Sequence, residues 1–89
     1  MKSRTTERFR REFGRLPREV QEQARAAYRL FQQNPHHPSL HFHRIQRIEA
    51  VYSARVGRNY RAVGTLEDDL VVWFWIGTHA DYDRLIENL

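Results

Sequence analysis

The chain has 89 residues and no cysteine, and 40% of its residues are hydrophobic and 12% aromatic. This length predicts a single domain over residues 1–89 with one modest core, and the composition excludes both disorder and a disulfide-stabilised fold. No apolar run approaches the ~20 residues of a membrane span, and the first residues lack the apolar core of a signal peptide, so we expect a soluble, cytoplasmic protein.

The net charge of +4 is distributed unevenly along the chain. Residues 1–33 carry nine Lys or Arg against four Asp or Glu, residues 34–61 carry five against one, and residues 62–89 carry one against six. All but one of the fifteen basic residues are arginine, which binds phosphate through planar, bidentate contacts. Two interpretations stay open: nucleic-acid binding, or GC-rich codon usage combined with solvated helix faces.

The first half of the chain predicts a strand and then two amphipathic helices. Residues 2–6 favour a short strand. Apolar residues at i, i+4 and i+7 predict a helix after it, and Pro17 ends that helix and begins a second one that runs to about Gln33. The apolar stripes consist of Phe9, Phe13 and Leu16, and then of Val20, Ala24, Ala27, Tyr28 and Phe31. Two helices joined this tightly form a helical hairpin.

The second half predicts strands joined by turns. A short strand is expected at about 42–47, after a proline-bounded loop. An alternating strand follows at 51–56, its return strand at 60–65, and a wholly apolar central strand at 70–76. Thr78 then predicts the N-cap of a short C-terminal helix, with Asp81 three residues on. The order is β-α-α-β-β-β, an α+β fold in which the helical hairpin covers one face of an antiparallel sheet.

A histidine follows the central strand directly. His79 is expected in the first turn of the last helix, where unpaired backbone N–H groups favour anions and disfavour an imidazolium. A neutral histidine there is able to act as a base. The alternative is that Thr78 and Asp81 only cap the helix and that His79 has no catalytic role.

Two arginines flank the predicted turn in YSARVGRNYRAVG. Arg55 and Arg61 occupy odd positions on strands whose even positions are candidate core, so both are expected opposite one another on the exposed face. Such a pair is able to clamp a phosphate. The alternative is that they are two solvated strand arginines.

Four histidines cluster in the loop and short strand before these arginines. They are His36, His37, His41 and His43. No cysteine joins them and their spacing matches no known ligand set, so loop solvation or contact with RNA phosphates is favoured over a metal site. Trp73 and Trp75 are expected on one face of the central strand, where core packing is favoured over stacking on bases.

The sequence resembles the RelE/ParE superfamily of toxins from bacterial type II toxin–antitoxin systems. The resemblance rests on the helical segment FRREFGRLPREVQEQARAAYRLFQQNP, the loop HPSLHFHRI, the strands YSARVGRNYRAVG and the ending VVWFWIGTHADYDRLI. Together these cover nearly the whole chain. The resemblance implies two helices packed on a curved antiparallel sheet, and an antitoxin as partner.

The activity that the resemblance implies differs between branches of the superfamily. RelE-like members cut mRNA in the ribosomal A site, whereas ParE-like members inhibit DNA gyrase without catalysis. The C-terminal histidine favours the RNase branch, and the resemblance carries the hairpin arginine onto Arg61 and the late acid/base position near His79. His41, His43 and Arg44 stand where some RelE members have a lysine-rich segment. Acidic residues, Asp81 and Asp83, stand where some relatives have basic or aromatic ones.

The hypothesis is RNA cleavage without metal or other cofactor, by in-line attack of a ribose 2′-hydroxyl on the adjacent phosphate. His79 is expected to act as base or acid, and Arg61 and Arg55 to stabilise the charge on the phosphorane. Asp81 either orients His79 or only caps the helix. The residues expected to bind substrate are His41, His43, Arg44, Arg58 and Tyr82. Either His41 or His43 is expected to carry the second proton.

Two alternatives remain open from the sequence. One is a gyrase inhibitor without catalysis, which fits the acidic C-terminal segment better because carboxylates repel RNA phosphates. The other is an inactive member that serves only as a scaffold for antitoxin binding.

Overall fold

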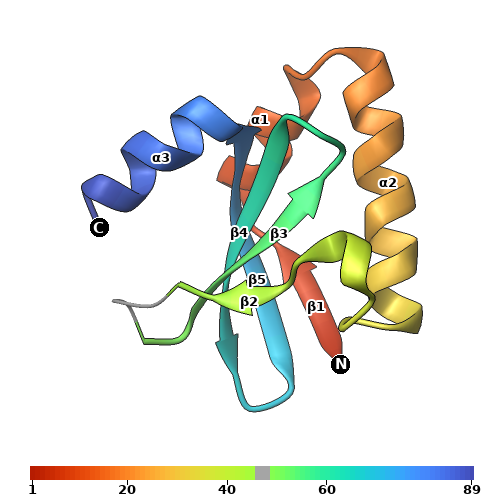
Figure 1. Ribbon diagram of the computed structural model, residues 1–89, viewed down its shortest axis with the longest axis vertical. Coiled ribbons are helices and arrows are strands. Elements are labelled where there is room, and N and C mark those ends of the chain that lie inside the picture. Colours follow the sequence, from red (N-terminus) through yellow and green to blue (C-terminus); the bar gives the residue numbers. More distant parts are fainter. Residues whose placement is uncertain (46–48) are drawn as a thin grey trace.

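The computed structural model describes residues 1–45 and 49–89. Its elements, labelled in Figure 1, are β1 (Lys2–Thr5), α1 (Glu7–Gly14), α2 (Arg18–Gln33), the 3-10 turn η1 (Pro38–Leu40), β2 (His43–Arg44), β3 (Val51–Val56), β4 (Tyr60–Glu67), β5 (Leu70–Thr78) and α3 (His79–Glu87). The α+β class is confirmed. The predicted order β-α-α-β-β-β is one strand short, because four strands, β2 to β5, follow α2. The strand expected at 42–47 is shorter than predicted, and its last part falls among residues 46–48, outside the described residues.

The five-stranded sheet has the order β1-β5-β4-β3-β2. Neighbouring strands from β2 to β5 are antiparallel, but β1 pairs with β5 in parallel. The expectation of a wholly antiparallel sheet is therefore corrected to a mixed sheet. The parallel pairing lets α1 begin directly above β5. The N–H of Thr6 donates to the carbonyl of Trp73 at 3.0 Å. The hydroxyl of Thr6 caps α1 by accepting from the N–H of Phe9.

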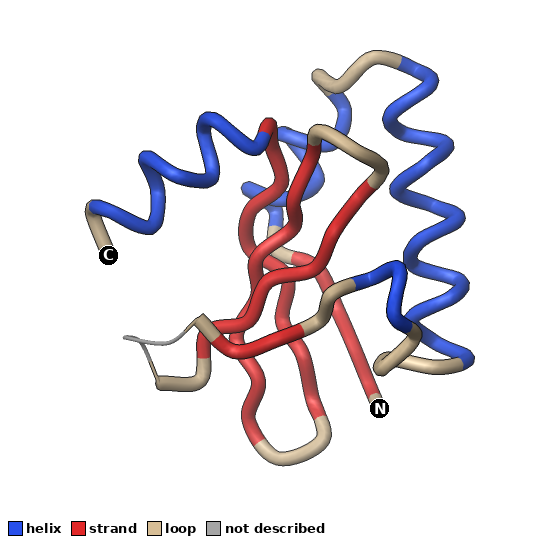
Figure 2. The backbone as a smooth tube through the Cα atoms, in the orientation of Figure 1, coloured by secondary structure: helices blue, strands red, loops and turns tan. Residues whose placement is uncertain are grey.

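The helices lie in two layers, one on each face of the sheet. α1 lies over β5 and α2 over β3, and α3 packs against β4 and β5. Figure 1 and the backbone tube in Figure 2 show α2 and α3 on opposite sides of the strands. Within the described residues, no helix combines the length and the apolar composition that a membrane span requires.

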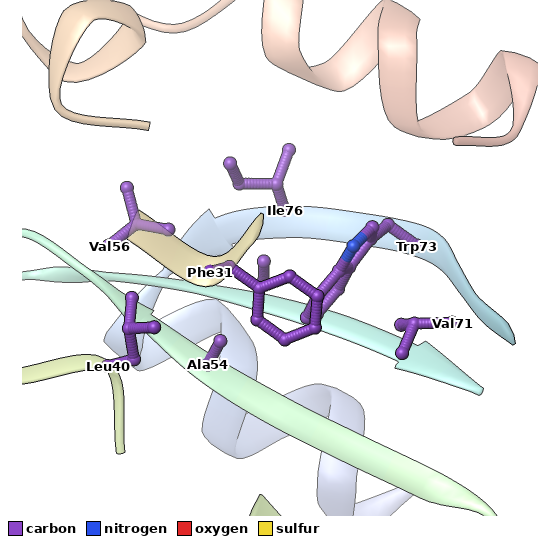
Figure 3. Packing of buried hydrophobic residues seen from close by; sticks show 8 residues of the cluster. Phe31, Leu40, Ala54, Val56, Val71, Trp73 and Ile76 are labelled. Atoms are coloured by element: carbon purple, nitrogen blue, oxygen red, sulfur yellow. The ribbon is translucent and has the colours of Figure 1, made fainter. Parts of the chain in front are cut away.

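The main core lies between the sheet and the helices α1 and α2. Figure 3 shows buried members of this cluster, among them Phe31 of α2 beside Trp73 of β5. The predicted helix stripes supply most of the helical side, although Val20 is buried outside this cluster. A second core on the α3 side contains Val51, Val63 and Trp75, and Tyr82, Leu85 and Ile86 of α3 pack against it.

A β-bulge divides these two cores. Val63 pairs with Trp75 but the next residue, Gly64, pairs with Trp73, so β5 carries one extra residue at this point. The extra residue breaks the alternation of side chains, and Trp73 joins the core under α1 and α2 whereas Trp75 joins the core under α3. The prediction that both tryptophans share one face is wrong. The prediction that they pack in the core is confirmed, since they are 4% and 6% exposed.

Gly64 is required at the bulge, and its replacement tests that requirement. A Cβ at Gly64 would lie 2.8 Å from the carbonyl oxygen of Val72 and 3.0 Å from the ring of Trp73. We expect Gly64→Ala to lower the free energy of unfolding by about 1–3 kcal/mol, because backbone and a packed indole must shift. The matched control is Gly14→Ala at the end of α1, where a Cβ meets nothing within 4 Å. That variant is expected to gain up to about 1 kcal/mol. Equal urea midpoints for the two variants would contradict this account.

Candidate functional site

The start of α3 is fixed by β5 and by the turn before β4. Thr78 ends β5 and caps α3, accepting a hydrogen bond from the N–H of Asp81 at 3.1 Å. The N–H of His79 donates to the carbonyl of Asn59 at 2.8 Å. The predicted N-cap is therefore confirmed, but two N–H groups expected to be free for an anion are already paired. Fewer backbone donors are therefore free for an anion than the sequence predicts, and side chains have to supply the rest.

Arg55 and Arg61 provide those side chains. They are direct register partners on β3 and β4, so they project from the same face of the sheet. Burial and the neighbouring charge of Arg55 lower the pKa of Arg61 from its ordinary value, while Tyr82 and Asp83 act in the opposite direction. Nε of Arg55 is buried without a hydrogen-bond partner among the described residues. Two adjacent guanidinium groups with unused donors form a site suited to an anion.

The α3 helix brings a histidine, a tyrosine and a carboxylate to this face. Nε2 of His79 lies 3.5 Å from Oδ1 of Asp83, and the His79 ring lies 6.0 Å from the ring of Tyr82. Tyr82 also lies 6.5 Å from Trp75, which anchors α3 on the sheet. Asp81 instead forms an ion pair with Arg84. The carboxylate that contacts His79 is therefore Asp83, not the Asp81 expected from the sequence.

The short strand β2 adds a second histidine to the same face of the sheet. His43 pairs with Ser53, which lies two residues before Arg55 on β3, or roughly 7 Å along the strand. Nδ1 of His43 lies 2.5 Å from the carbonyl oxygen of His41, and its Nε2 lies 3.5 Å from the hydroxyl of the buried Ser53. His41 itself is exposed and adopts a positive φ of 44°, and its carbonyl oxygen is the group that contacts His43.

Two predicted substrate-binding residues lie elsewhere. Arg44 pairs with Tyr52, and because side chains alternate along a strand it projects to the α2 side, away from His43. Arg58 lies in the exposed turn between β3 and β4, where it lines a surface hollow together with Ala26 and Leu30 of α2. The structure thus groups Arg55, Arg61, His79 and Tyr82 with Asp83 on one face, and places His43 farther along it. We call this group the α3-face site.

The sequence prediction assigned a role neither to Asp83, which belongs to the α3-face site, nor to Ser53, which contacts His43. The signal for Asp83 is its i, i+4 spacing from His79, which places both side chains on one helical face. The signal for Ser53 is its place between Val51 and Arg55 in the alternating strand, which aligns it with the arginine pair.

The side chains of the α3-face site suit acid–base chemistry on an anionic group. Two guanidinium groups supply positive charge, an imidazole supplies a group able to accept or donate a proton, and a carboxylate contacts that imidazole. Among residues 1–45 and 49–89, no three His, Cys, Asp or Glu side chains come together as a metal site would require.

The family follows from comparison of the sequence with family models. The ParE-like toxin domain matches residues 18–84, which is well over half of the chain. The chain belongs to this family, and it is thus a toxin of the RelE/ParE superfamily from type II toxin–antitoxin systems, as the resemblance implied. Comparison with curated proteins finds no match.

Solved structures of such toxins share the fold. A chain of the RelB–RelE antitoxin–toxin complex from Methanococcus jannaschii matches with a TM-score of 0.72 at 17% identity, over 90% of this chain and 95% of that one. YafQ from Escherichia coli BL21(DE3) matches with a TM-score of 0.72 at 16% identity, over 90% and 94%. The isolated RelE toxin from E. coli gives 0.67 at 17% identity, over 99% and 98%. At such low identity these likenesses establish the fold alone.

Proposed function

We propose that the protein is an endoribonuclease toxin that stops translation by cutting mRNA on the ribosome. The observation that carries the proposal is the convergence of Arg55 and Arg61 with His79 on one face of the sheet. An anion site beside an ionisable imidazole meets the two needs of phosphate transfer, which are charge stabilisation and proton movement. The RelE-like fold supports the same branch of the superfamily.

In this mechanism a ribose 2′-hydroxyl attacks the adjacent phosphorus in line with the leaving 5′ oxygen. His79 takes the proton from the hydroxyl or gives one to the leaving oxygen, and Asp83 holds the imidazole in place. Arg61 and Arg55 stabilise the charge on the phosphorane. His43 is the proposed second proton carrier, because a proton on Nδ1 would be donated to the His41 carbonyl and would leave Nε2 as the basic nitrogen.

A cognate antitoxin is the proposed protein partner. The solved relatives include toxins in complex with their antitoxins, namely RelB–RelE from M. jannaschii and DinJ–YafQ from E. coli. The basic surface of residues 1–61, with fourteen Lys or Arg against five Asp or Glu, favours a partner segment that is partly acidic.

Gyrase inhibition is the second candidate function, and the acidic α3 favours it. Asp81, Asp83 and Glu87 lie on this one helix, and carboxylates close to an RNA site repel phosphate. Adding purified protein to a translation reaction and to a gyrase supercoiling reaction separates the two. We expect arrested translation with cut mRNA and unaffected supercoiling. Inhibited supercoiling with intact mRNA would overturn the proposal in favour of gyrase, and no effect in either assay would favour an inactive scaffold.

The carboxylate of Asp83 is expected to weaken RNA binding at the arginine pair. We predict that Asp83→Asn strengthens the binding of a 2′-O-methyl RNA, which cannot be cleaved, by roughly two- to fivefold, as expected for partly exposed charges. The control, Asp81→Asn, removes the same charge from a residue that pairs with Arg84 instead and should have a smaller effect. Fluorescence anisotropy measures both affinities. If Asp83→Asn binds RNA no more tightly than Asp81→Asn, the placement of RNA beside Arg61 is wrong.

A further inference from the structure

A surface hollow lies beside the outer edge of β3. It opens where α2 and η1 pass the end of this strand, as the positions of these elements in Figure 1 show. Its volume is about 510 Å³, which is in the range of ligand-binding pockets. We call it the β3-edge hollow, and the residues that line it include Ala26 and Leu30 of α2, Ser39 and Leu40 of η1, and Arg55 and Arg58.

The backbone of Arg55 points toward the outer edge of the sheet. Two hydrogen bonds fix the directions of the backbone groups along β3. The carbonyl of Val51 accepts from the N–H of Ile45 at 2.8 Å, on the β2 side. The carbonyl of the preceding residue, Ala50, accepts from the N–H of Leu66 at 2.7 Å, on the β4 side. Because the direction alternates from residue to residue, the N–H and C=O of Arg55 both point to the β2 side.

The strand β2 ends before it reaches Arg55. Its first residue, His43, pairs with Ser53, and two residues earlier the chain turns away at His41, which has a φ of 44°. Among residues 1–45 and 49–89, no strand pairs with Arg55 on this side. One backbone donor and one backbone acceptor therefore lie together, without a strand partner, on the wall of the β3-edge hollow.

Arg55 also connects the hollow with the α3-face site. Its side chain shares a face with that of Arg61, whereas its backbone groups point along the sheet toward the hollow, so a ligand held by the arginine pair has the hollow beside it. Arg58, which is exposed in the turn after β3, adds a further positive charge. None of the described residues that line the hollow is acidic. The positive charge therefore continues from the arginine pair into the hollow, which suits a polyanion.

We propose that the β3-edge hollow binds one nucleobase of the RNA, next to the phosphate that Arg55 and Arg61 hold. The base pairs its own donor and acceptor with the N–H and C=O of Arg55, and its ring lies against Ala26 and Leu30. Bases of single-stranded RNA are commonly recognised in this way, splayed out and hydrogen-bonded along one edge. The inference deepens the proposed function and rests on it for the position of the phosphate.

The test is the binding of short 2′-O-methyl RNA oligonucleotides, which cannot be cleaved. One oligonucleotide is intact, and each of the others lacks the base at a different position. We expect the loss of one particular base to weaken binding about tenfold, the value of one or two hydrogen bonds, and the loss of any other base to weaken it less than about threefold. Fluorescence anisotropy measures the affinities.

Filling the hollow should abolish this preference. Ala26 is exposed and lines the hollow, so Ala26→Leu places a larger side chain where the base binds, and leucine is nearly as good a helix former as alanine. The intact RNA and the RNA without the preferred base should then bind within about twofold of each other. The control is Gln32→Leu, at an exposed position of the same helix that does not line the hollow, and it should keep the tenfold difference. Arg61→Ala should weaken both RNAs by the same factor, because Arg61 contacts the phosphate.

The backbone amide of Arg55 provides a direct measurement. In ¹⁵N-labelled protein its proton should move downfield when the intact RNA binds, and it should stay in place with the RNA that lacks the preferred base. An amide proton that stays in place with RNA but moves with an extended peptide of alternating threonine and valine would show that this edge binds a strand of a protein. That result would overturn the proposal.

Two further outcomes separate this inference from the proposed function. Equal losses for every missing base, or an unchanged base preference in Ala26→Leu, would overturn the base site and leave the endoribonuclease proposal standing. A folded protein that binds none of the oligonucleotides would overturn both.

Discussion

Replacing His79 with alanine is expected to lower the single-turnover rate of RNA cleavage by about 10²–10⁴-fold, as for the loss of one proton carrier. The side chain of His79 is half exposed and its only ion-pair contact is with Asp83 in the described part of the chain, so the variant should keep its melting temperature. The bond from its N–H to Asn59 is made by the backbone and remains. A folded His79→Ala protein that cuts RNA at the wild-type rate would show that the catalytic assignment is wrong.

The companion variant is Arg61→Ala, which removes one of the two cations from the same face. We expect a loss of about 10²–10³-fold in cleavage rate, the size found for a lost charge-stabilising donor. The control is Arg18→Ala, an exposed residue that pairs only with Glu22 in the described structure. A solvated helix arginine contributes weak, screened electrostatics, so this variant should cleave nearly as fast as the wild type.

The largest loss of stability is expected from Phe31→Ala. Phe31 is 3% exposed and packs edge-on against Phe42 and Trp73, with ring centroids at 5.0 and 5.4 Å. It thereby joins α2 to the loop before β2 and to the centre of the sheet. Truncation should lower the free energy of unfolding by about 3–5 kcal/mol, a large fraction of the 5–15 kcal/mol typical of a domain. Urea unfolding followed by tryptophan fluorescence measures the change.

The control for this experiment is Leu89→Ala, which alters a side chain that is 54% exposed. It should change stability by less than about 0.5 kcal/mol. A loss below about 1 kcal/mol for Phe31→Ala would mean that α2 does not depend on this contact and that the core is misassigned.

Much of the fold is predictable from local pattern. The stripe from Phe9 to Phe31 and the alternation at 51–56 identify helices and strand because side chains repeat with the period of the element. The parallel pairing of β1 with β5 and the bulge at Gly64 are not predictable from local pattern. Both depend on which strands pair, and one extra residue in β5 moves Trp75 to the other face without any change in local pattern.

The candidate site, too, was predictable from the sequence only in part. The pairing of Arg55 with Arg61 follows from the tight turn between two strands, which fixes the register. The partner of His79 also follows from helical periodicity, which the sequence prediction did not apply. Asp83 lies at i, i+4 on the same helical face as His79, whereas Asp81 at i, i+2 lies on another face and pairs with Arg84. Which of His43 and Arg44 shares a face with the arginine pair depends on the register of the two-residue strand β2.

The measurement that tests the central claim most directly is the chemistry of the RNA ends. Ribosomes carrying a defined mRNA are incubated with the purified toxin, and the ends of the RNA fragments are identified. A final aliquot, from which the ribosomes are removed, receives free RNA and EDTA. We predict fragments ending in a 2′,3′-cyclic phosphate and a 5′-hydroxyl, the products of in-line attack by the 2′-hydroxyl, and no cutting at a 2′-O-methyl nucleotide. Intact mRNA, or cutting that leaves a 3′-hydroxyl and continues at the 2′-O-methyl position, would contradict the account.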